Sequence, residues 1–360
     1  MAFLHAIATA TPAVSIDEMD SMALANNLVS LTTDQERTTN AIYRKSGVGQ
    51  RHSVILDEPS GPVESRQSFY NQAGSGDPDG PSMRDRMEMY EQKAPPLARQ
   101  SADVALARAG VRTDAIGNLV TVSCTGFAAP GWDVALVRDV LHPGVERTHV
   151  GFMGCHGSFN GLRVASSLTR SSSAPVLMTS TELCTIHHRY QWEPETTVAN
   201  ALFADGSGSV VLSPERDGAV ARYIGSQSRL QPGTEQDMSW KLGNHGFVMT
   251  LSIEVPIVIG RELRPWLDDW LATHDLSVGD VAGWAIHPGG PRILAVAAET
   301  LKLNRHDLRF SYDVLRENGN MSSSTVLFIL ERMIGEVQGP VVALGFGPGL
   351  TFEAMLLELL

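Results

Sequence analysis

Three side chains suited to covalent catalysis stand at turns that are far apart in the chain. Cys155 lies in the small-residue segment Gly151–Ser158, His287 is followed by Pro288–Gly290, and Asn320 follows a glycine. A thiol can act as the nucleophile of an acyl transfer, while an imidazole and a carboxamide can donate hydrogen bonds to an oxygen that becomes negatively charged. If the fold brings these three side chains together, the chain is an acyl-transfer enzyme.

Each of the three residues stands where an apolar run ends and a helix-like run begins. Cys155 precedes a helix-like stretch, Pro291 after His287 fits the first turn of a helix, and Asn320 precedes the polar helix entry Ser322–Thr325. A thiol at a helix N-terminus lies at the positive end of the helix dipole, which predicts a lowered thiol pKa. The glycines around the cysteine allow a tight turn and the close approach of a substrate.

Taken singly, each residue has a simpler explanation. A lone cysteine is most often a small buried apolar residue, and we keep that interpretation for Cys124 and Cys184. His287 alone could be a structural residue at a strand end, and Asn320 alone could be a helix cap. The combination of all three with flanking glycines favours the catalytic interpretation.

Short apolar runs alternate with amphipathic stretches along the chain, which is typical of an α/β protein. The predicted strands are Leu119–Ser123, Arg147–Met153, Val176–Ser180, Gly208–Leu212, Val281–Ile286 and Val341–Gly345. The predicted helices are Pro95–Ala109, Trp132–Leu141, Ser158–Thr169, Val255–Ala272, Pro291–Leu301 and Ser322–Ile334.

Two segments interrupt this alternation. Residues 57–86 are rich in turn formers, notably Asp57–Pro62 and Gly74–Pro81, and they predict a long surface excursion that is either a lid or a plain loop. The turn Ser213–Gly218 divides the chain into an N-terminal half, residues 1–215, with the cysteine, and a C-terminal half, residues 216–360, with the histidine and asparagine. The halves share one weak echo, because a Gly-Cys pair precedes a helix in the first and a Gly-Asn pair precedes a helix in the second.

The composition narrows the class of protein. Of the 360 residues 43% are hydrophobic, and the formal net charge of -12 argues against general binding to nucleic acids or anionic membranes. Neither a secretory signal nor a run of about 18 uncharged apolar residues is visible, so we expect a soluble, cytoplasmic protein. Three cysteines without close spacing predict neither a disulfide framework nor a zinc site, and we expect no bound metal.

A local basic segment contrasts with the acidic whole. Arg37, Arg44, Lys45 and Arg51 fall within residues 37–56, which contain no acidic residue. Such a patch suits a phosphate-bearing ligand, although an ordinary solvated surface would show the same charges.

Longer segments of the chain resemble the bacterial-type type III polyketide synthases, the chalcone synthase-like condensing enzymes of the thiolase superfamily. The resembling segments are Ala8–Pro12, Ala201–Gly206, His287–Leu294, Gly319–Leu330 and Gly345–Thr351. The last three are long and specific. The resemblance covers most of the chain, least convincingly residues 57–86.

The resemblance implies a thiolase-like α/β fold in which two related halves form a five-layered α-β-α-β-α core, and it implies a homodimer. Cys155, His287 and Asn320 match the family's catalytic triad. Cys155 would take an acyl group from acyl-coenzyme A, and the other two would promote decarboxylation of malonyl-coenzyme A and stabilise the enolate that attacks the Cys155 thioester. Coenzyme A thioesters would be the substrates, no further cofactor is implied, and an acyl carrier protein is a further candidate partner.

The resemblance also implies residues that contact the substrate. The pocket residues would be Thr125, His156, His188, Phe203, Met249, Ser322, Gly345, Phe346, Gly347 and Pro348, and the coenzyme A contacts would be Lys45 and, more loosely, Arg44. His188 and Met249 stand where the family has gatekeeping phenylalanines, and Ala129 stands where a methionine crosses the dimer contact. His188 would make the pocket entrance more polar and titratable, which predicts an unusual acyl donor.

Three other functions fit part of the pattern. A ketoacyl synthase III-like enzyme would use the same residue types for one condensation or for acyl transfer, with the acyl group delivered by a carrier protein. A papain-like protease also places its cysteine well before its histidine, but Cys155 lacks the Cys-Gly-Ser-Cys-Trp setting of that family. A non-enzymatic acyl-binding protein would be supported by the absence of covalent acylation at Cys155.

Overall fold

The computed structural model describes residues 1–75 and 79–360, which fold as a mixed α/β protein. The strands are β1 (Ala2–Ala10), β2 (Ser15–Asp17), β3 (Gln50–His52), β4 (Asn118–Ser123), β5 (Glu146–Gly151), β6 (Val176–Leu183), β7 (Asp205–Ser213), β8 (Ala221–Leu230), β9 (Met238–Gly243), β10 (Gly246–Leu251), β11 (Gly283–Ile286), β12 (Gly339–Gly347) and β13 (Thr351–Leu359). The α-helices are α1 (Glu18–Leu28), α2 (Thr33–Lys45), α3 (Met83–Ala109), α4 (Trp132–Asp139), α5 (Gly157–Ser171), α6 (Pro194–Leu202), α7 (Glu254–Ala272), α8 (Pro291–Leu301), α9 (Arg309–Asn318) and α10 (Thr325–Met333).

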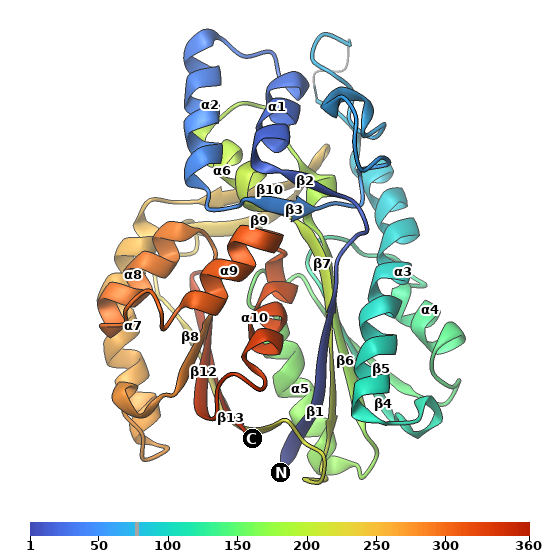
Figure 1. Cartoon of the computed structure of the whole chain (residues 1–360), viewed down its shortest axis with the longest axis vertical. Coiled ribbons are helices and arrows are strands. Elements are labelled where there is room, and N and C mark those ends of the chain that lie inside the picture. The colour runs from blue at the N-terminus through green and yellow to red at the C-terminus, as the bar shows by residue number, and fades with distance from the viewer. Residues whose placement is uncertain (76–78) are drawn as a thin grey trace.

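These elements stack in five alternating layers (Figure 1). From one side of the molecule to the other, the layers are α7 with α8, the strands β8, β12 and β13, the central helices α5 and α10, the strands β1, β7, β6, β4 and β5, and finally α3 with α4. The thiolase-like α-β-α-β-α arrangement that the resemblance implies is confirmed.

Strand directions repeat between the two halves of the sheet. In the N-terminal half, β1 is antiparallel to β7, β7 is antiparallel to β6, and β6 is parallel to β4. In the C-terminal half, β8 is antiparallel to β13, β13 is antiparallel to β12, and β12 is parallel to β11. The halves are therefore built on one plan, and the antiparallel pairing of β1 with β8 joins them into a nine-stranded sheet.

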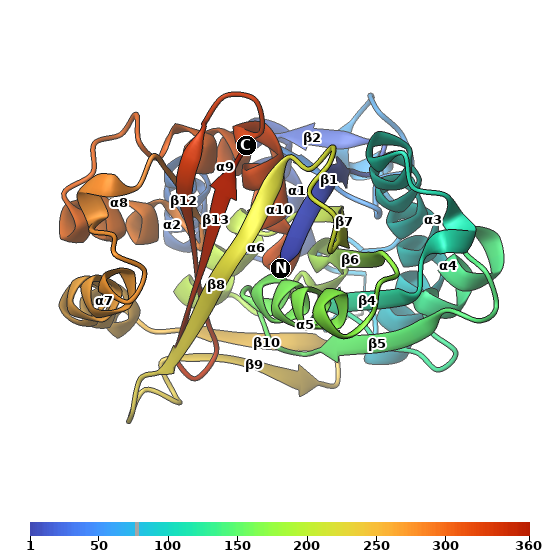
Figure 2. The ribbon, with the colours of Figure 1, turned by 90° about the horizontal axis from the view of Figure 1, so that it is seen from below.

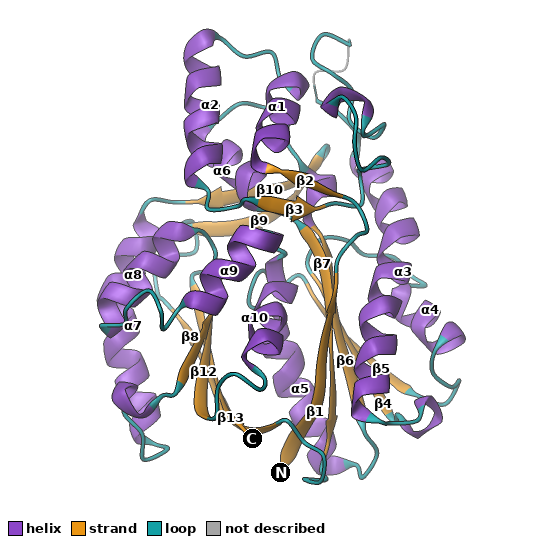
Figure 3. Cartoon of the chain, in the orientation of Figure 1, coloured by secondary structure: helices purple, strands orange, loops and turns teal. Residues whose placement is uncertain are grey.

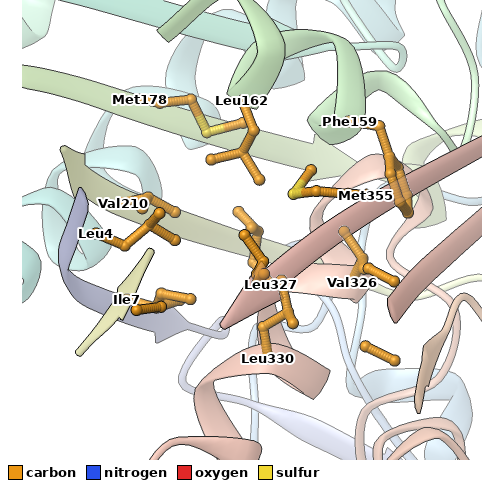
Figure 4. Packing of buried hydrophobic residues seen from close by; sticks show 14 of the residues in the cluster. Leu4, Ile7, Phe159, Leu162, Met178, Val210, Val326, Leu327, Leu330 and Met355 are labelled. Atoms are coloured by element: carbon orange, nitrogen blue, oxygen red, sulfur yellow. The ribbon is translucent and has the colours of Figure 1, made fainter. Parts of the chain in front are cut away.

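The two central helices place the turns that carry the catalytic candidates. Helix α5 begins just after Cys155 and α10 begins shortly after Asn320, and both lie in the middle layer (Figure 1). Phe159, Leu162 and Leu327 from these helices pack with strand residues of both halves in one buried cluster (Figure 4). Burial of each such side chain stabilises the fold by roughly 1.5–3 kcal/mol, so the starts of both helices are firmly held.

Helices α1, α2 and α6 lie together at one end of the molecule, beyond the layered core, and we call them the helical cap (Figure 3). The short strands β2 and β3 and the β9–β10 pair lie between the helical cap and the core. A capping box starts α2, in which Thr32 and Gln35 exchange side-chain and backbone hydrogen bonds. The cap is thus a defined helical layer over the end of the core.

Most of the core elements agree with the sequence-based predictions. The predicted strands overlap β4, β5, β6, β7, β11 and β12, and the predicted helices overlap α3, α4, α5, α7, α8 and α10. The predictions missed the strands β1, β8 and β13 and all of the helical cap. The segment predicted to divide the halves, Ser213–Gly218, lies between β7 and β8.

Helix α3 begins well before the predicted position at Pro95. Ser82 caps the helix by accepting from the Asp85 N–H, and Asp85 accepts from the Ser82 N–H in return. Pro95 and Pro96 lie inside the helix. The predicted start at Pro95 is wrong, because the Ser82–Asp85 capping box begins the helix more than ten residues earlier.

Segment 57–86 is a surface segment up to its helical end. Its described residues before Met83 are mostly exposed and contain no helix or strand apart from a short 3₁₀ turn, Val63–Ser65, so the loop prediction is confirmed for them. Buried Val63 and Tyr70 anchor the segment, and the Tyr70 hydroxyl donates to the Thr185 carbonyl at 2.7 Å. The prediction is wrong from Met83, where helix α3 begins, and residues 76–78 of the run Gly74–Pro81 lie outside the described residues.

Within the described ranges, no helix combines the length and the apolar character needed to cross a membrane.

Candidate active site

The turn between β5 and α5 holds the Cys155 thiol where the two halves meet. Phe152 and Gly154 have φ angles of 61° and 80°, so the chain turns sharply just before the cysteine. A Cβ atom at Gly154 would lie 2.3 Å from Pro348 Cδ, so only glycine allows the loop after β12 to come this close. Cys155 is buried, and its sulfur receives a hydrogen bond from Ser322 Oγ at 3.8 Å.

Asn320 is fixed through both its backbone and its side chain. Its N–H donates to the Leu202 carbonyl, and its own carbonyl accepts from the Ala204 N–H, each at 2.9 Å. The side-chain Oδ1 accepts from the Ser322 N–H at 2.9 Å. This bond leaves the amide nitrogen for the cavity, and the Asn320 side chain acts to lower the pKa of Cys155 against the larger effect of burial.

His287 is held by its backbone rather than by its ring. Its N–H donates to the Leu344 carbonyl of β12 at 2.8 Å. The ring is buried, and among the described residues neither Nδ1 nor Nε2 has a hydrogen-bond partner. Because buried polar groups are almost always paired, two unpaired nitrogens indicate a site for a ligand. Burial, with a smaller effect of nearby His156, lowers the pKa of His287 to about 3, so the ring is neutral near pH 7.

The structure brings Cys155, His287 and Asn320 to the wall of one cavity with an empty volume of about 440 Å³. Their three turns come from β5–α5, β11–α8 and α9–α10, so two of the groups belong to the C-terminal half and one to the N-terminal half. Phe203 and Met249 complete the wall beside the thiol. A thioester bound here would have its carbonyl within a buried space that holds a nucleophile and two neutral hydrogen-bonding groups.

Burial has a larger effect on the pKa of the Cys155 thiol than the dipole of the helix that follows it. Burial raises the pKa of Cys155 to about 12, although the hydrogen bond from Ser322 acts in the opposite direction. The lowered pKa predicted from the dipole of α5 is therefore wrong, because desolvation of the thiolate outweighs the dipole. A thiol that stays protonated at neutral pH needs a proton acceptor nearby, and the neutral ring of His287 lies in the same cavity.

Two further thiols lie beside Cys155. Cys124 and Cys184 line, together with Cys155, a second cavity with an empty volume of about 360 Å³. Cys124 Sγ accepts from the Gly154 N–H at 3.0 Å, and burial raises the pKa of both additional thiols well above the usual value. Their predicted burial is confirmed, but they form the wall of the site rather than a distant part of the core.

Most of the predicted pocket residues border the two cavities at Cys155. These are Thr125, Phe203, Met249, Ser322, Phe346 and Pro348. Gly345 and Gly347 instead face the packed core, since a Cβ atom would lie 2.6 Å from the Phe159 ring at Gly345 and 2.2 Å from the His156 ring at Gly347. Their prediction as pocket residues is wrong, because they point away from the cavity that Phe346 lines.

His156 is likewise a packing residue. Nδ1 of its buried ring donates to Asn160 Oδ1 at 2.9 Å, and Asn160 Nδ2 in turn donates to Glu353 of β13 at 3.2 Å. This chain of contacts ties α5 to the C-terminal half of the sheet. The prediction of His156 as a pocket residue is wrong, and its effect on the site is the influence on the pKa of His287 described above.

His188 lies farther from the nucleophile than the gatekeeping prediction requires. It lines a larger cavity under the helical cap, where its Nε2 lies 3.4 Å from Asn200 Nδ2. Burial lowers the pKa of His188 to about 3, so the predicted titratable entrance is wrong. The aromatic residue between this larger cavity and Cys155 is Phe203, which lines all three cavities.

Two aromatic side chains beside the site, Trp240 and His187, were not among the sequence-based predictions. Trp240 of β9 donates from Nε1 to the Cys124 carbonyl at 2.8 Å. His187 stacks on Phe247 with ring centroids 4.3 Å apart, and its Nε2 lies 2.7 Å from the Thr125 carbonyl. Neither residue belongs to a recognisable motif, so only the three-dimensional structure could place them.

A buried carboxyl group, which the sequence-based predictions also did not include, connects the turn after β4 to the turn that carries Asn320. Glu182 accepts from the Cys124 N–H at 2.9 Å, from Thr125 Oγ1 at 2.7 Å, and from the Ser323 hydroxyl. Ser323 follows Asn320, so Glu182 holds the asparagine turn of one half against the other half. Burial raises the pKa of Glu182, while its hydrogen bond from Ser323 acts against that rise. One acidic residue in the otherwise uncharged strand β6 was a usable signal in the sequence.

The four residues of the predicted basic patch differ in burial and in their partners. Arg51 is buried and donates to backbone carbonyls at the end of α6, so it is not free to bind a phosphate. Arg37 pairs at the surface with an aspartate one turn away on the same helix. Arg44 and Lys45 are exposed in the last turn of α2.

Comparison with known proteins places the whole chain in one family. Residues 1–215 match the N-terminal domain and residues 223–360 the C-terminal domain of the chalcone and stilbene synthases. An alpha-pyrone synthesis polyketide synthase-like protein of Mycobacterium tuberculosis is 30% identical over 376 aligned residues, which cover 100% of this chain and 92% of that protein. The 1,3,6,8-tetrahydroxynaphthalene synthase of Streptomyces peucetius subsp. caesius is 33% identical over 272 residues, which cover 73% of this chain and 72% of that protein.

Solved structures agree with this assignment. The crystal structure of PKS-I from the brown alga Ectocarpus siliculosus superposes with a TM-score of 0.91 at 28% identity and covers 100% of this chain and 98% of that one. The C-terminal type III polyketide synthase domain of Steely1 from Dictyostelium gives a TM-score of 0.90 at 26% identity, with 99% of each chain covered. The ketoacyl synthase III-like alternative is not favoured by these similarities. The chain belongs to the chalcone and stilbene synthase family, the type III polyketide synthases.

Proposed function

We propose that this enzyme loads an acyl group from acyl-coenzyme A onto Cys155 and extends it by decarboxylative condensation with malonyl-coenzyme A. The observation that carries the proposal is the single buried cavity lined by Cys155, His287 and Asn320, in which both nitrogens of the His287 ring lack a partner within the described chain. These are the groups that covalent acyl transfer and enolate formation require.

In the loading step, the Cys155 sulfur attacks the thioester carbonyl and displaces coenzyme A. A carbon–sulfur bond forms to Cys155, the bond to the coenzyme A sulfur breaks, and the thiol proton ends on coenzyme A. The His287 ring is neutral and has an unpaired nitrogen in the same cavity, so it can accept a hydrogen bond from the Cys155 thiol as the sulfur attacks. Its pKa of about 3 makes it a weak base, so the ring relays the proton to the departing coenzyme A sulfur instead of holding it.

In the extension step, malonyl-coenzyme A loses carbon dioxide and leaves an enolate. The Asn320 amide and a neutral His287 N–H donate hydrogen bonds to the enolate oxygen. Neutral donors of this kind stabilise the negative charge without transferring a proton to the enolate. The enolate carbon then bonds to the acyl carbonyl, and the Cys155 thiolate leaves and regains a proton. We propose that no further cofactor is needed, since the three side chains supply the nucleophile, the proton carrier and the oxyanion donors.

Incubation with acyl-coenzyme A and malonyl-coenzyme A tests this function. Mass spectrometry should show an acyl adduct on the Cys155 peptide and products that contain several malonyl-derived units, such as pyrones or resorcinols. Products with only one added unit would contradict repeated extension. The same acyl group on an acyl carrier protein tests that further candidate donor.

We propose that Lys45, with Arg44 beside it, contacts the phosphates of coenzyme A. The end of α2 packs against the start of α8, because a Cβ atom at Gly47 would lie 3.2 Å from Pro291 Cγ. Gly289, just before α8, lines the cavity of the catalytic triad. The exposed cations Arg44 and Lys45 at the end of α2 therefore lie next to the start of α8, which borders the cavity of the catalytic triad.

A Lys45→Glu variant is expected to raise the KM for malonyl-coenzyme A by about three- to tenfold, because reversal of an exposed phosphate contact changes an ion-pair energy of about 0.2–1 kcal/mol twice over. The KM for malonyl-N-acetylcysteamine, which lacks the phosphates, should not change. Arg37→Glu, an exposed position earlier in α2, is the matched control. Equal effects on both thioesters would show that Lys45 does not contact the phosphates.

We propose that the enzyme is a homodimer that forms across β5. This strand ends the nine-stranded sheet, and within residues 1–75 and 79–360 no strand pairs with its outer edge (Figure 2). Phe152 and Met153 directly follow it and are exposed, and exposed Phe127 lines one hollow with Arg147 and His149 of the strand. A hollow of about 820 Å³ beside β5 is lined by Ala129, the position at which the family's methionine crosses the dimer contact. An open strand edge with exposed apolar side chains is a site for pairing with another chain.

Phe127→Asp is expected to raise the dimer dissociation constant by about thirtyfold or more, because it places a charge in an apolar contact. Phe127 is 54% exposed in the single chain. Ile257→Asp is the matched control, since Ile257 is 50% exposed on α7 at the opposite end of the molecule (Figure 2). Sedimentation velocity over a range of protein concentrations measures the effect, and an equal response to both variants would place the dimer contact elsewhere.

A further inference from the structure

A further cavity lies under the helical cap and adjoins the cavities at Cys155. Its empty volume of about 790 Å³ exceeds those of the two cavities that Cys155 lines. It shares Phe203, Trp240 and Met249 with the cavity that Cys155, Cys124 and Cys184 line. These three side chains are thus the partition between the nucleophile and the cap cavity.

The wall of the cap cavity is mainly apolar. Helix α1 contributes Leu24, Ala25 and Leu28, and the segment after β3 contributes Ile55 and Leu56. These alkyl side chains come from two separate segments of the chain, and polar side chains such as His188 and Asn200 interrupt the apolar surface between them. Such a surface favours an apolar ligand by roughly 25 cal/mol for each Å² removed from water.

Most polar groups on this wall are already engaged by the protein. Arg51 donates to the carbonyls of Asn200 and Phe203, and the Tyr70 hydroxyl donates to the Thr185 carbonyl. Two buried polar groups on the wall lack a partner in the described part of the chain, the Ser21 hydroxyl on α1 and Nε of Arg51. The other nitrogens of Arg51 are held by backbone carbonyls, so these two groups offer little to orient a polar ring, and the cavity selects mainly by length and apolar contact.

One part of the partition can move. Trp240 is fixed by its bond to the Cys124 carbonyl, and the backbone of Phe203 forms a β-bridge with Asn320. Met249 has neither restraint, and an unbranched thioether side chain adapts easily to a neighbouring group. Rotation of Met249 would join the cap cavity to the space beside the Cys155 sulfur, with Cys184 on both walls.

We infer that the starter of this enzyme is an unbranched alkyl acyl group, whose chain extends from Cys155 past Met249 into the cap cavity, and that α1 sets the chain length it accepts. The inference rests on the proposed function, in which Cys155 carries the acyl group. Helix α1 rises from β2 away from the core, so Leu28 lies toward its outer end (Figure 1). Ala25 and Leu28 are one turn apart and are the side chains that an increasingly long chain meets on this wall.

A series of saturated acyl-coenzyme A starters tests the inference. The kcat/KM should rise about fourfold for each added methylene until the cavity is full, and then fall. Acetyl-coenzyme A and benzoyl-coenzyme A should be poor starters. A flat profile, or a preference for either of these two, would overturn the inference.

Two opposite substitutions identify α1 as the element that sets the length. Ala25→Leu adds about three carbons to the wall and should shorten the preferred chain by about three methylenes, and Leu28→Ala should lengthen it by a similar amount. Ala23→Leu makes the first change on the same helix outside the cavity and should leave the preferred length unchanged. Shifts in opposite directions cannot arise from a general loss of folding, and an unmoved preference in both variants would overturn the role of α1.

The adduct on Cys155 separates this inference from the proposed function. If no acyl-coenzyme A acylates Cys155, the proposed function fails and the chain-length profile has no meaning. If Cys155 is acylated and extended while the preferred length ignores both substitutions, the proposed function holds and the cap cavity is not the site of the chain.

Discussion

A Cys155→Ala variant is expected to lose both the covalent acyl adduct and product formation, by at least about 10⁴-fold in turnover, because no other group of the cavity can replace the nucleophile. Cys155 is the thiol that shares a cavity with His287 and Asn320, and its sulfur receives a hydrogen bond from Ser322 Oγ. Intact-protein and peptide mass spectrometry after incubation with acyl-coenzyme A measures the adduct. Product analysis after addition of malonyl-coenzyme A measures turnover.

Cys184→Ala is the informative companion to this variant. Cys184 lines one cavity with Cys155 but does not line the cavity that holds His287 and Asn320. The Cys184→Ala protein should still carry an acyl adduct at Cys155. An adduct that persists in Cys155→Ala and disappears in the double variant would assign the nucleophile to Cys184 and contradict the mechanism.

The catalytic turns could be predicted because their chemistry and their geometry leave local marks. Cys155 and Asn320 each follow a glycine, and His287 is followed by a proline. Glycine permits backbone angles that other residues avoid and proline fixes φ, so both mark turns wherever they occur. The sequence therefore located the three turns, and the repeated strand plan explains why they meet. Glycine at 154 is required by the approach of Pro348, which no pattern in the sequence could show.

Strand β13 shows where local patterns fail. The segment Thr351–Leu359 is rich in leucine and glutamate and includes methionine, residues that favour helices. It is nevertheless a buried strand between β12 and β8. Pairing on both edges and burial on both faces decide its conformation, so the strand depends on contacts far away in the chain.

The wrong pocket assignments on β12 have a simple geometric cause. Successive side chains of a strand point to opposite faces. Phe346 lines the catalytic cavity, so Gly345 and Gly347 must face the other way, where they meet Phe159 and His156. A motif identifies the segment that borders a site but not which of its residues faces the substrate. The cap cavity was still harder to predict from the sequence, because its wall is assembled from segments that are far apart in the chain.

An Asn320→Ala variant is expected to keep the acyl adduct at Cys155 but to lose about 10²–10³ in the rate of malonyl decarboxylation. The amide nitrogen faces the sulfur side of the cavity because Oδ1 is held by the Ser322 N–H, so it can donate to the enolate oxygen but is not needed for the attack on the starter. Release of labelled carbon dioxide from malonyl-coenzyme A, measured beside the mass of the adduct, separates the two steps. Loss of both signals together would place Asn320 in the fold of the site rather than in the extension step.

Asn320→Asp distinguishes the donor from the structural role of this side chain. A carboxylate oxygen can still accept the Ser322 N–H that Oδ1 accepts at 2.9 Å, but it offers no N–H to the enolate. The adduct should persist and decarboxylation should fall as in Asn320→Ala. The pH test uses Asn320→Ala, which places no new carboxylate beside the ring. Because burial lowers the pKa of His287 to about 3, this remaining donor stays neutral as pH falls from about 8 to about 5, and its protonation should add no step to the residual rate. A step centred between about pH 6 and 7 would mean that His287 titrates in the working enzyme and that a charged imidazolium, rather than a pair of neutral donors, stabilises the enolate.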